Sequence, residues 1–359
     1  MSTLTESPST VFDVPAAGFA PAPAEVRGRG RDAVRLLVAT PESITHATFR
    51  DLPGQLAAGD VVVVNNSATV AGEIDAVGPR GPAVLHLATQ LDDADPAVGG
   101  ASGTWILEVR TAPDASRSVL DAAVGDRFAV GEVELTLLEP YPRLGSSPTG
   151  RGNRLWRALV LGDLRAHLGA AGRPIAYGYL DRRYPLAAYQ SVFATVPGSA
   201  EMPSAGRPFT RSLVTELVSR GIAVAPITLH TGLSSQEAGE APQPERFEVS
   251  AATARLVNAV RAGGGRVVAV GTTVTRALES AVVDGRLVAR QGWTDRVVTP
   301  AEPPQVVTGL ITGWHDPQAS HLLLVEAVAG TALTQRAYDA AVTGGYLWHE
   351  FGDAALLLP

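Results

Sequence analysis

The spacing of apolar residues changes along the 359-residue chain, and this change limits the possible folds more than any other feature. Between residues 68 and 165, six short β-rich runs are separated by clusters of Gly, Pro, Asp and Ser. Such spacing is typical of a small antiparallel barrel or sandwich. After residue 166, strand-like runs alternate with amphipathic helical stretches, which indicates an α/β domain.

Several segments outside residues 68–165 also have sequence patterns typical of strands or helices. Short β-rich runs at 35–39, 61–64 and 222–229 predict strands. Ser250 is a good N-cap for a helix that Gly263 ends.

We therefore predict an α/β domain with a mixed sheet and an inserted antiparallel β-barrel domain. Residues 1–67 and 166–359 form the discontinuous α/β domain, and residues 68–165 form the barrel. Loops are expected at 92–103 and 142–152.

The composition excludes several classes of protein. The chain has no cysteine, which excludes a disulfide framework, a thiolate zinc site and a cysteine nucleophile. It has no lysine, so a P-loop is absent, and no G-x-G-x-x-G motif follows a strand. The first eleven residues lack a secretory pattern, and no apolar run approaches the about 20 residues of a membrane helix. A soluble cytoplasmic protein with no membrane partner is expected.

The net charge of −7 means that any contact with nucleic acid must be local. Two basic stretches could provide it, and solvated surface charge is the alternative for each: Arg27, Arg29, Arg31 and Arg35, and Arg173, Arg182 and Arg183.

Polar residues follow four predicted strands, where ligands bind in open α/β sheets. Asn65 and Asn66 follow the first of these strands, and His230 ends the second. Asparagines offer donors and acceptors, and a histidine can transfer protons near neutral pH. A simple turn and a structural histidine are the alternatives.

The third junction joins a strand to a helix start. Gly271 allows close backbone approach, and Thr272 and Thr273 could hold a carboxylate or phosphate. Arg276 and Glu279 are spaced i, i+3 and are predicted to pair.

The fourth junction begins at Thr312. Trp314 could stack on a base, and Asp316 could orient His315 for proton transfer. A packed tryptophan in a capped loop is the alternative. The remaining histidines show no metal-ligand spacing, and no metal site is predicted.

Taken in order, eight segments resemble the queuosine-pathway S-adenosylmethionine:tRNA ribosyltransferase-isomerase family. They include ITLHTGL at 227–233 and GGRVVAVGTTVTRALES at 264–280. The other six segments are 12–15, 34–37, 49–67, 189–206, 306–317 and 351–358.

The resemblance implies the predicted fold and a reaction. Family members transfer the ribosyl part of S-adenosylmethionine to 7-aminomethyl-7-deazaguanine in the tRNA wobble position. Adenine and methionine leave, and the ribosyl unit isomerises to the epoxycyclopentanediol of epoxyqueuosine. The resemblance thus implies a transferase and isomerase of queuosine biosynthesis and tRNA modification. It is expected to be a cytoplasmic monomer whose partners are S-adenosylmethionine and tRNA, with no further cofactor.

This chemistry needs a base for the C5′ proton and acceptors near the sulfonium. Carried onto this chain, the resemblance implies His230, His315 and Asp295 as catalytic residues. The candidates for substrate binding are Asn65, Asn66, Ser204, Thr272, Thr273, Arg276, Glu279, Thr312, Trp314 and Asp353.

The chain departs from the family pattern at several polar positions. One family histidine is replaced by Pro208, and two others fall near Glu240 and Gln243 and are lost. Two family arginines are replaced by Ala68 and Glu73. Lost positive charge weakens phosphate contact. Two alternatives stay open: a relative that uses S-adenosylmethionine on a non-tRNA acceptor, and a catalytically silent binding protein.

Overall fold

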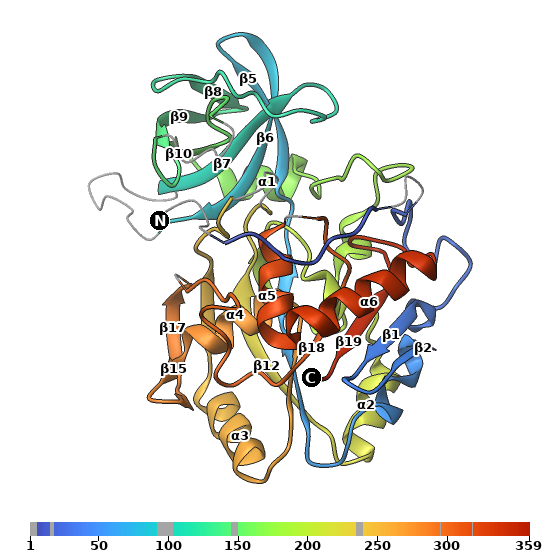
Figure 1. Ribbon diagram of the computed structural model, residues 1–359. Coiled ribbons are helices and arrows are strands. Elements are labelled where there is room, and N and C mark those ends of the chain that lie inside the picture. The colour runs from blue at the N-terminus through green and yellow to red at the C-terminus, as the bar shows by residue number, and fades with distance from the viewer. Residues whose placement is uncertain are drawn as a thin grey trace.

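The computed structural model describes residues 6–14, 18–91, 103–144, 150–234, 240–294, 296–317 and 319–359. Figure 1 shows a barrel at one end of the molecule and a larger α/β part below it. Most of the predicted loop at 92–103 lies outside the described residues, and Gly103 begins a strand.

The α/β part is built on a mixed sheet of nine strands among the described residues. Across the sheet they are β17 (Arg290–Trp293), β13 (Arg246–Val249), β12 (Ala223–His230), β3 (Val61–Asn65), β14 (Val267–Val270), β18 (Gly309–Thr312), β19 (Ala354–Leu357), β1 (Arg35–Ala39) and β2 (Ile44–Thr48). Strands β12, β3, β14 and β18 run parallel to one another, so their carboxyl ends meet at one edge.

The central strand β3 explains why this sheet is covered on both faces. All its residues are buried, as a continuous valine run requires. Val61 and Val63 pack with α3 (Ala251–Ala262), α4 (Thr272–Ser280), α5 (Ser320–Ala329) and α6 (Thr331–Thr343). Val62 and Val64 pack on the opposite face with α2 (Arg211–Ser219) and the 3₁₀ helix η2 (Phe49–Gly54).

The barrel is closed and antiparallel. Its strands, in order around the barrel, are β10 (Leu155–Leu161), β7 (Gly103–Thr111), β6 (Gly81–Gln90), β5 (Glu73–Gly78), β8 (Arg127–Val130) and β9 (Val133–Pro140). Leu85, Leu107, Leu135 and Trp156 fill its interior, and α1 (Leu164–Ala171) adds Leu164 to the same core.

The barrel strands lie in sequence between β3 and the later strands of the sheet, which confirms the predicted fold class. The domain limits at 67/68 and 165/166 stay predictions. The remaining short elements are η1 (Arg31–Ala33), η3 (Leu186–Tyr189), η4 (Ser204–Gly206), β4 (Ser67–Thr69), β11 (Val196–Ser199), β15 (Val282–Val283) and β16 (Arg286–Leu287).

The predicted ends of α3 are confirmed. The Ser250 hydroxyl accepts a hydrogen bond from the Thr253 N–H at 3.1 Å, and the helix ends at Gly263. Within the described residues, every helix is too short or too polar to cross a membrane.

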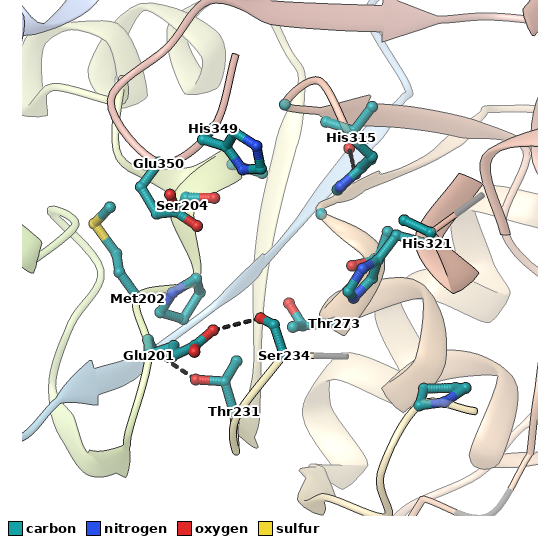
Figure 2. A pocket seen from close by; sticks show the side chains of 18 of the residues that line it. Glu201, Met202, Ser204, Thr231, Ser234, Thr273, His315, His321, His349 and Glu350 are labelled. Atoms are coloured by element: carbon teal, nitrogen blue, oxygen red, sulfur yellow. Dashed lines mark hydrogen bonds between the residues drawn. The ribbon is translucent and has the colours of Figure 1, made fainter. Parts of the chain in front are cut away.

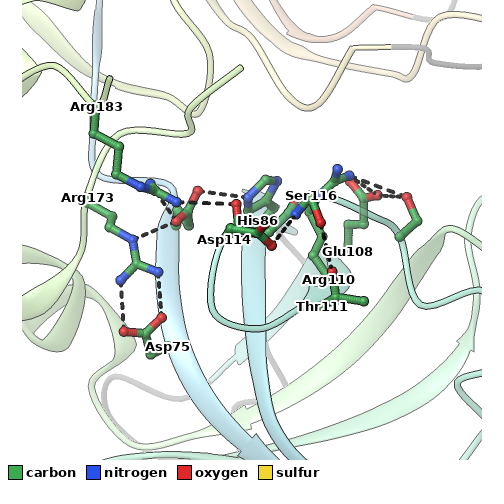
Figure 3. A network of polar contacts seen from close by, with 12 residues as sticks. Asp75, His86, Glu108, Arg110, Thr111, Asp114, Ser116, Arg173 and Arg183 are labelled. Carbon is green, nitrogen blue, oxygen red and sulfur yellow. Dashed lines mark hydrogen bonds and ion pairs between the residues drawn. The ribbon is translucent and has the colours of Figure 1, made fainter. Parts of the chain in front are cut away.

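A network of ionic groups joins the barrel to the segment after α1 (Figure 3). Glu73 of β5 is fully buried, and its carboxylate contacts His86 at 3.0 Å, Arg173 at 2.6 Å and Arg183 at 2.8 Å. Arg173 also binds the exposed Asp75. The negative charge at position 73 is therefore neutralised by cations from outside the barrel.

Candidate active site

A cavity of about 380 Å³ lies at the carboxyl ends of β12, β14 and β18. The segments 231–234, 271–276 and 312–317, which follow these strands, line it together with 201–205 and 349–350. This is the edge where an α/β sheet binds ligands.

The start of α4 forms one wall. Gly271 connects β14 to the helix with φ of 91°, a conformation that residues with a side chain rarely adopt. A Cβ there would also lie 3.2 Å from the Cβ of Ala205. No side chain caps the helix, and Thr272 and Thr273 line the cavity. Binding of an anion at this end of the helix stays a prediction.

Arg276 lines the cavity but does not pair with Glu279, so that prediction is wrong. Its guanidinium forms an ion pair with Glu245 and donates to the Gln243 carbonyl at 2.7 Å and to Thr294 at 2.9 Å. Its Nε has no protein partner.

Glu279 lies on the other side of α4, away from the cavity. Its carboxylate accepts backbone N–H groups of Gln305, Val306 and Val307 at 2.8–3.0 Å and pairs with Arg296 at 3.4 Å. It anchors the segment before β18, because four donors converge on it. Substrate binding by Glu279, as predicted, would require it to leave these partners.

Two stacked histidines line the cavity on the same side as Thr273. The rings of His315 and His321 lie 5.1 Å apart and nearly parallel. Nε2 of His315 is 3.0 Å from the Thr312 hydroxyl. Burial lowers the pKa of His315 well below its ordinary value, and burial lowers that of His321 to about 4. Both rings are neutral at pH 7, so each can accept a proton.

Asp316 does not orient His315, in contrast to the prediction. Its carboxylate lies 3.2 Å from Nε2 of His349. The His349 ring contacts Phe19 at 5.0 Å and Tyr179 at 5.1 Å, and these two rings also contact each other at 5.4 Å. The backbone turns sharply here, because His349 has φ of 66°. Adjacent Glu350 accepts a hydrogen bond from the Tyr179 hydroxyl.

Glu201 adds a further carboxyl group to the cavity. It is 8% exposed and accepts a hydrogen bond from the Ser234 hydroxyl (Figure 2). Burial raises the pKa of Glu201, although the Ser234 hydrogen bond and the charge of Arg154 oppose this shift. A buried carboxyl group of this kind favours a cationic ligand.

His230 is placed outside the cavity. Its neighbour Thr231 lines the cavity, and side chains alternate along a strand, so the His230 ring points the other way. Nδ1 of His230 lies 2.7 Å from the Ser67 hydroxyl, and a Cβ on Gly198 would lie 2.5 Å from that nitrogen. Burial lowers the pKa of His230, and Arg246 and Arg165 lower it further.

Asn65 and Asn66 join β3 to β12 and do not line the cavity. Asn65 donates to the Leu229 carbonyl at 2.8 Å and accepts the Leu229 N–H at 3.1 Å. Asn66 accepts the Thr228 hydroxyl at 2.7 Å. These amide groups form hydrogen bonds at the point where the chain leaves the sheet. The arrangement corresponds to the simple turn given above as the alternative to ligand binding.

Two other predicted residues belong to the core. Trp314 is 2% exposed and packs against Tyr338 and Trp348, so its ring is not open to a base. Asp353 accepts the backbone N–H groups of Arg35 at 2.8 Å and Leu347 at 2.9 Å. Asp295 lies outside the described residues.

The cavity therefore holds six of the predicted residues: Ser204, Thr272, Thr273, Arg276, Thr312 and His315. It also holds Glu201, His321, His349 and Glu350, which were not predicted. No local motif marks these four, because they come from separate segments that only the fold brings together.

Two positions that depart from the family pattern border the same region. Gln243 lines the cavity, and its Oε1 has no protein partner. Glu240 binds the buried Arg154 at 2.7 Å, and Arg154 also contacts Glu108 of the barrel. In the described part of the chain, no three His, Asp or Glu side chains gather as a metal ion would require.

Comparison with known proteins agrees with the fold. The family model described as "Queuosine biosynthesis protein" matches residues 9–357. An S-adenosylmethionine:tRNA ribosyltransferase-isomerase from Anaeromyxobacter dehalogenans is 36% identical over 91% of this chain and 93% of its own length. One from Symbiobacterium thermophilum is 35% identical over 97% of this chain and 98% of its own length.

A solved structure is also similar. The crystal structure of an S-adenosylmethionine tRNA ribosyltransferase from Thermotoga maritima matches with a TM-score of 0.52 and 25% identity. The match covers 97% of this chain and 99% of that one. From its sequence, its fold and these relatives, the chain belongs to the queuosine biosynthesis protein family.

Proposed function

We propose that this protein is an S-adenosylmethionine:tRNA ribosyltransferase-isomerase. It transfers the ribosyl unit to the aminomethyl group of 7-aminomethyl-7-deazaguanine in tRNA and isomerises it, giving epoxyqueuosine, adenine and methionine. The observation that supports this most is one cavity in which neutral His315 and His321 face the carboxyl groups of Glu201 and Glu350. Figure 2 shows these two sets on opposite sides.

The start of α4 is the proposed site for the methionine part of S-adenosylmethionine. A carboxylate there would accept the N–H groups and hydroxyls of Thr272 and Thr273. The orphaned Nε of Arg276 lies on the same helix and supplies a further donor. The sulfonium is a permanent cation, so it would be stabilised by the buried carboxyl group of Glu201.

His315 is the proposed base for the C5′ proton. When its Nε2 donates to the Thr312 hydroxyl, Nδ1 carries the lone pair that accepts the proton. Burial keeps the ring neutral before the reaction. The adjacent sulfonium makes the C5′ proton acidic enough for a weak base. His230 would act only through another group, since its ring is bound to Ser67.

Contacts with tRNA are proposed to be few. Of the predicted basic residues, Arg31, Arg173 and Arg183 are committed to ion pairs within the protein. Arg29 and Arg182 are exposed, and Arg182 follows the cavity segment that contains Tyr177 and Tyr179. A monomer in the cytoplasm fits this proposal, because one chain supplies the whole cavity wall and both substrates are cytoplasmic.

The proposal is tested by following adenine release from S-adenosylmethionine, with and without tRNA that carries the aminomethyl deazaguanine. We expect adenine only with this tRNA, in a one-to-one ratio to modified nucleoside. Release that needs no tRNA would instead indicate a non-tRNA acceptor. Absence of S-adenosylmethionine binding in calorimetry would indicate the silent binding protein.

A further inference from the structure

Glu350 is a half-buried carboxyl group in the cavity, and its contacts among the described residues include no cation. Figure 2 shows its side chain beside Ser204, across the cavity from His321 and Thr273. The Tyr179 hydroxyl donates a hydrogen bond to its Oε2. Among the described residues, no Arg or His lies within ion-pair distance of it.

Two other acidic groups of the cavity pair with cations, and Glu201 has a different environment. Glu245 pairs with Arg276, and Asp316 pairs with His349. Glu201 accepts the Ser234 hydroxyl and feels the charge of Arg154. A buried carboxylate without a counter-ion is unfavourable unless it is protonated or its cation arrives with a ligand.

The surroundings of Glu350 leave its carboxyl group only partly ionised near neutral pH. Burial raises its pKa to about 7, so half of the molecules carry the carboxylate near neutral pH. The other titratable groups that line the same cavity or its extension are Tyr177, Tyr179, Glu201, Glu245, Arg276, His315, Asp316, His321, His349, Arg31, Arg207 and Asp353. Of the three arginines, Arg31 and Arg207 are bound to Glu25, and Arg276 is bound to Glu245.

A small hollow of about 20 Å³ shares Ser204, His349 and Glu350 with the cavity and continues to Arg31. Glu350 thus lies between the interior and the basic N-terminal stretch, the side on which a polyanion is more favourably held. The proposed methionine site at Thr272 and Thr273 lies on the other side. The cationic group expected beside Glu350 is therefore that of the acceptor.

We propose that Glu350 is a catalytic residue that binds the aminomethyl nitrogen of the acceptor and removes one proton from it. This inference rests on the proposed function. The acceptor enters as an ammonium ion, which has no lone pair for attack. One N–H bond breaks, an O–H bond forms on the Glu350 carboxyl group, and the electron pair stays on nitrogen to form the new N–C bond.

The test compares the wild type with Glu350→Gln in tRNA-dependent adenine release between about pH 5.5 and 9.5. The wild-type kcat/KM for tRNA should rise about tenfold per pH unit and level off near the pKa of Glu350. Glu350→Gln should be slowed at least about tenfold at pH 7 and should keep rising to about pH 9, where solvent deprotonates the amine. Its KM for S-adenosylmethionine should change less than about twofold.

Two controls accompany this measurement. Glu248→Gln removes an exposed carboxyl group on β13 and should keep the wild-type profile. Difference infrared spectra at varied pH should show a carboxyl band that is lost with a midpoint near 7 in the wild type and is missing in folded Glu350→Gln.

A Glu350→Gln enzyme that keeps the wild-type profile would overturn the inference, and so would a loss confined to the KM for S-adenosylmethionine. In both cases wild-type turnover would leave the proposed function standing. A wild type that releases no adenine with tRNA would instead overturn the proposed function.

Discussion

At the scale of single residues, one histidine that ends β12 and one that follows β18 meet different surroundings. His315 lines the cavity, whereas the His230 ring is enclosed by Ser67 and the backbone near Gly198. The sequence around each one looks equally suited to proton transfer. The difference comes from the side of the strand on which each ring lies, which depends on register in the folded sheet.

We expect His315→Asn to lower turnover by about 100- to 10,000-fold, because the proposed base is lost. The melting curve followed by circular dichroism should stay close to that of the wild type. His230→Asn should instead lower stability by about 1 kcal/mol, through its hydrogen bond to Ser67, and keep most of its turnover. Loss of turnover in His230→Asn together with normal turnover in His315→Asn would indicate that His230, and not His315, takes part in the reaction.

At the scale of elements, the junction of β14 and α4 depends on one backbone conformation. Gly271 has φ of 91° and ψ of 162°, a region that is essentially restricted to glycine. This conformation turns the chain from the strand into a helix whose first residues line the cavity. The strand, the glycine and the helix start therefore form the proposed anion-binding unit.

We expect Gly271→Ala to lower the free energy of unfolding by about 1–3 kcal/mol and to weaken S-adenosylmethionine binding. The new Cβ would lie 3.2 Å from Ala205, which also borders the cavity. Urea unfolding and calorimetric titration measure the two effects. Gly264→Ala is the matched control, because Gly264 has φ of 77° and no atom within 4 Å of the added Cβ. It should lose stability and keep its affinity.

At the scale of the whole molecule, buried charge connects the barrel to the α/β part. Burial alone would raise the pKa of Glu73, but the hydrogen bond and charge of His86 and the contacts of Arg173 and Arg183 outweigh it, and the pKa falls to about 2. A carboxyl group whose pKa is lower in the folded state stabilises the fold at pH values above its ordinary pKa. The ordinary value for this group is 4.5.

We expect Glu73→Gln to lower the free energy of unfolding at pH 7 by about 3 kcal/mol, because Arg173 and Arg183 lose their buried carboxylate partner. The difference from the wild type should shrink as the pH falls below 4.5 and become small near pH 2, where Glu73 is half protonated in the folded state and fully protonated in the unfolded state. Urea unfolding at a series of pH values measures this. Asp75→Asn is the control: it removes an exposed partner of Arg173 and should cost less than about 1 kcal/mol. A constant difference from pH 7 to 2 would contradict the prediction.

The sequence by itself determined the architecture. The valine run of β3, the six short runs of the barrel and the capped helix after Ser250 are local patterns, and each forms the predicted element. Local patterns also located the start of α4 at the cavity, because a strand, a glycine and a helix are consecutive in the chain.

Only the tertiary structure decided which polar groups meet in the cavity. Glu201, His321 and Glu350 lie far apart in the sequence, yet they line one space. Glu201 lies within the family segment 189–206, but nothing local to it indicated a role in a site. Trp314 and Asp353 lie in promising segments, yet packing and backbone hydrogen bonds bury them in the core. The physical reason is that a site is set by the direction of side chains and by long-range packing, whereas strands and helices are set by the spacing of neighbours along the chain.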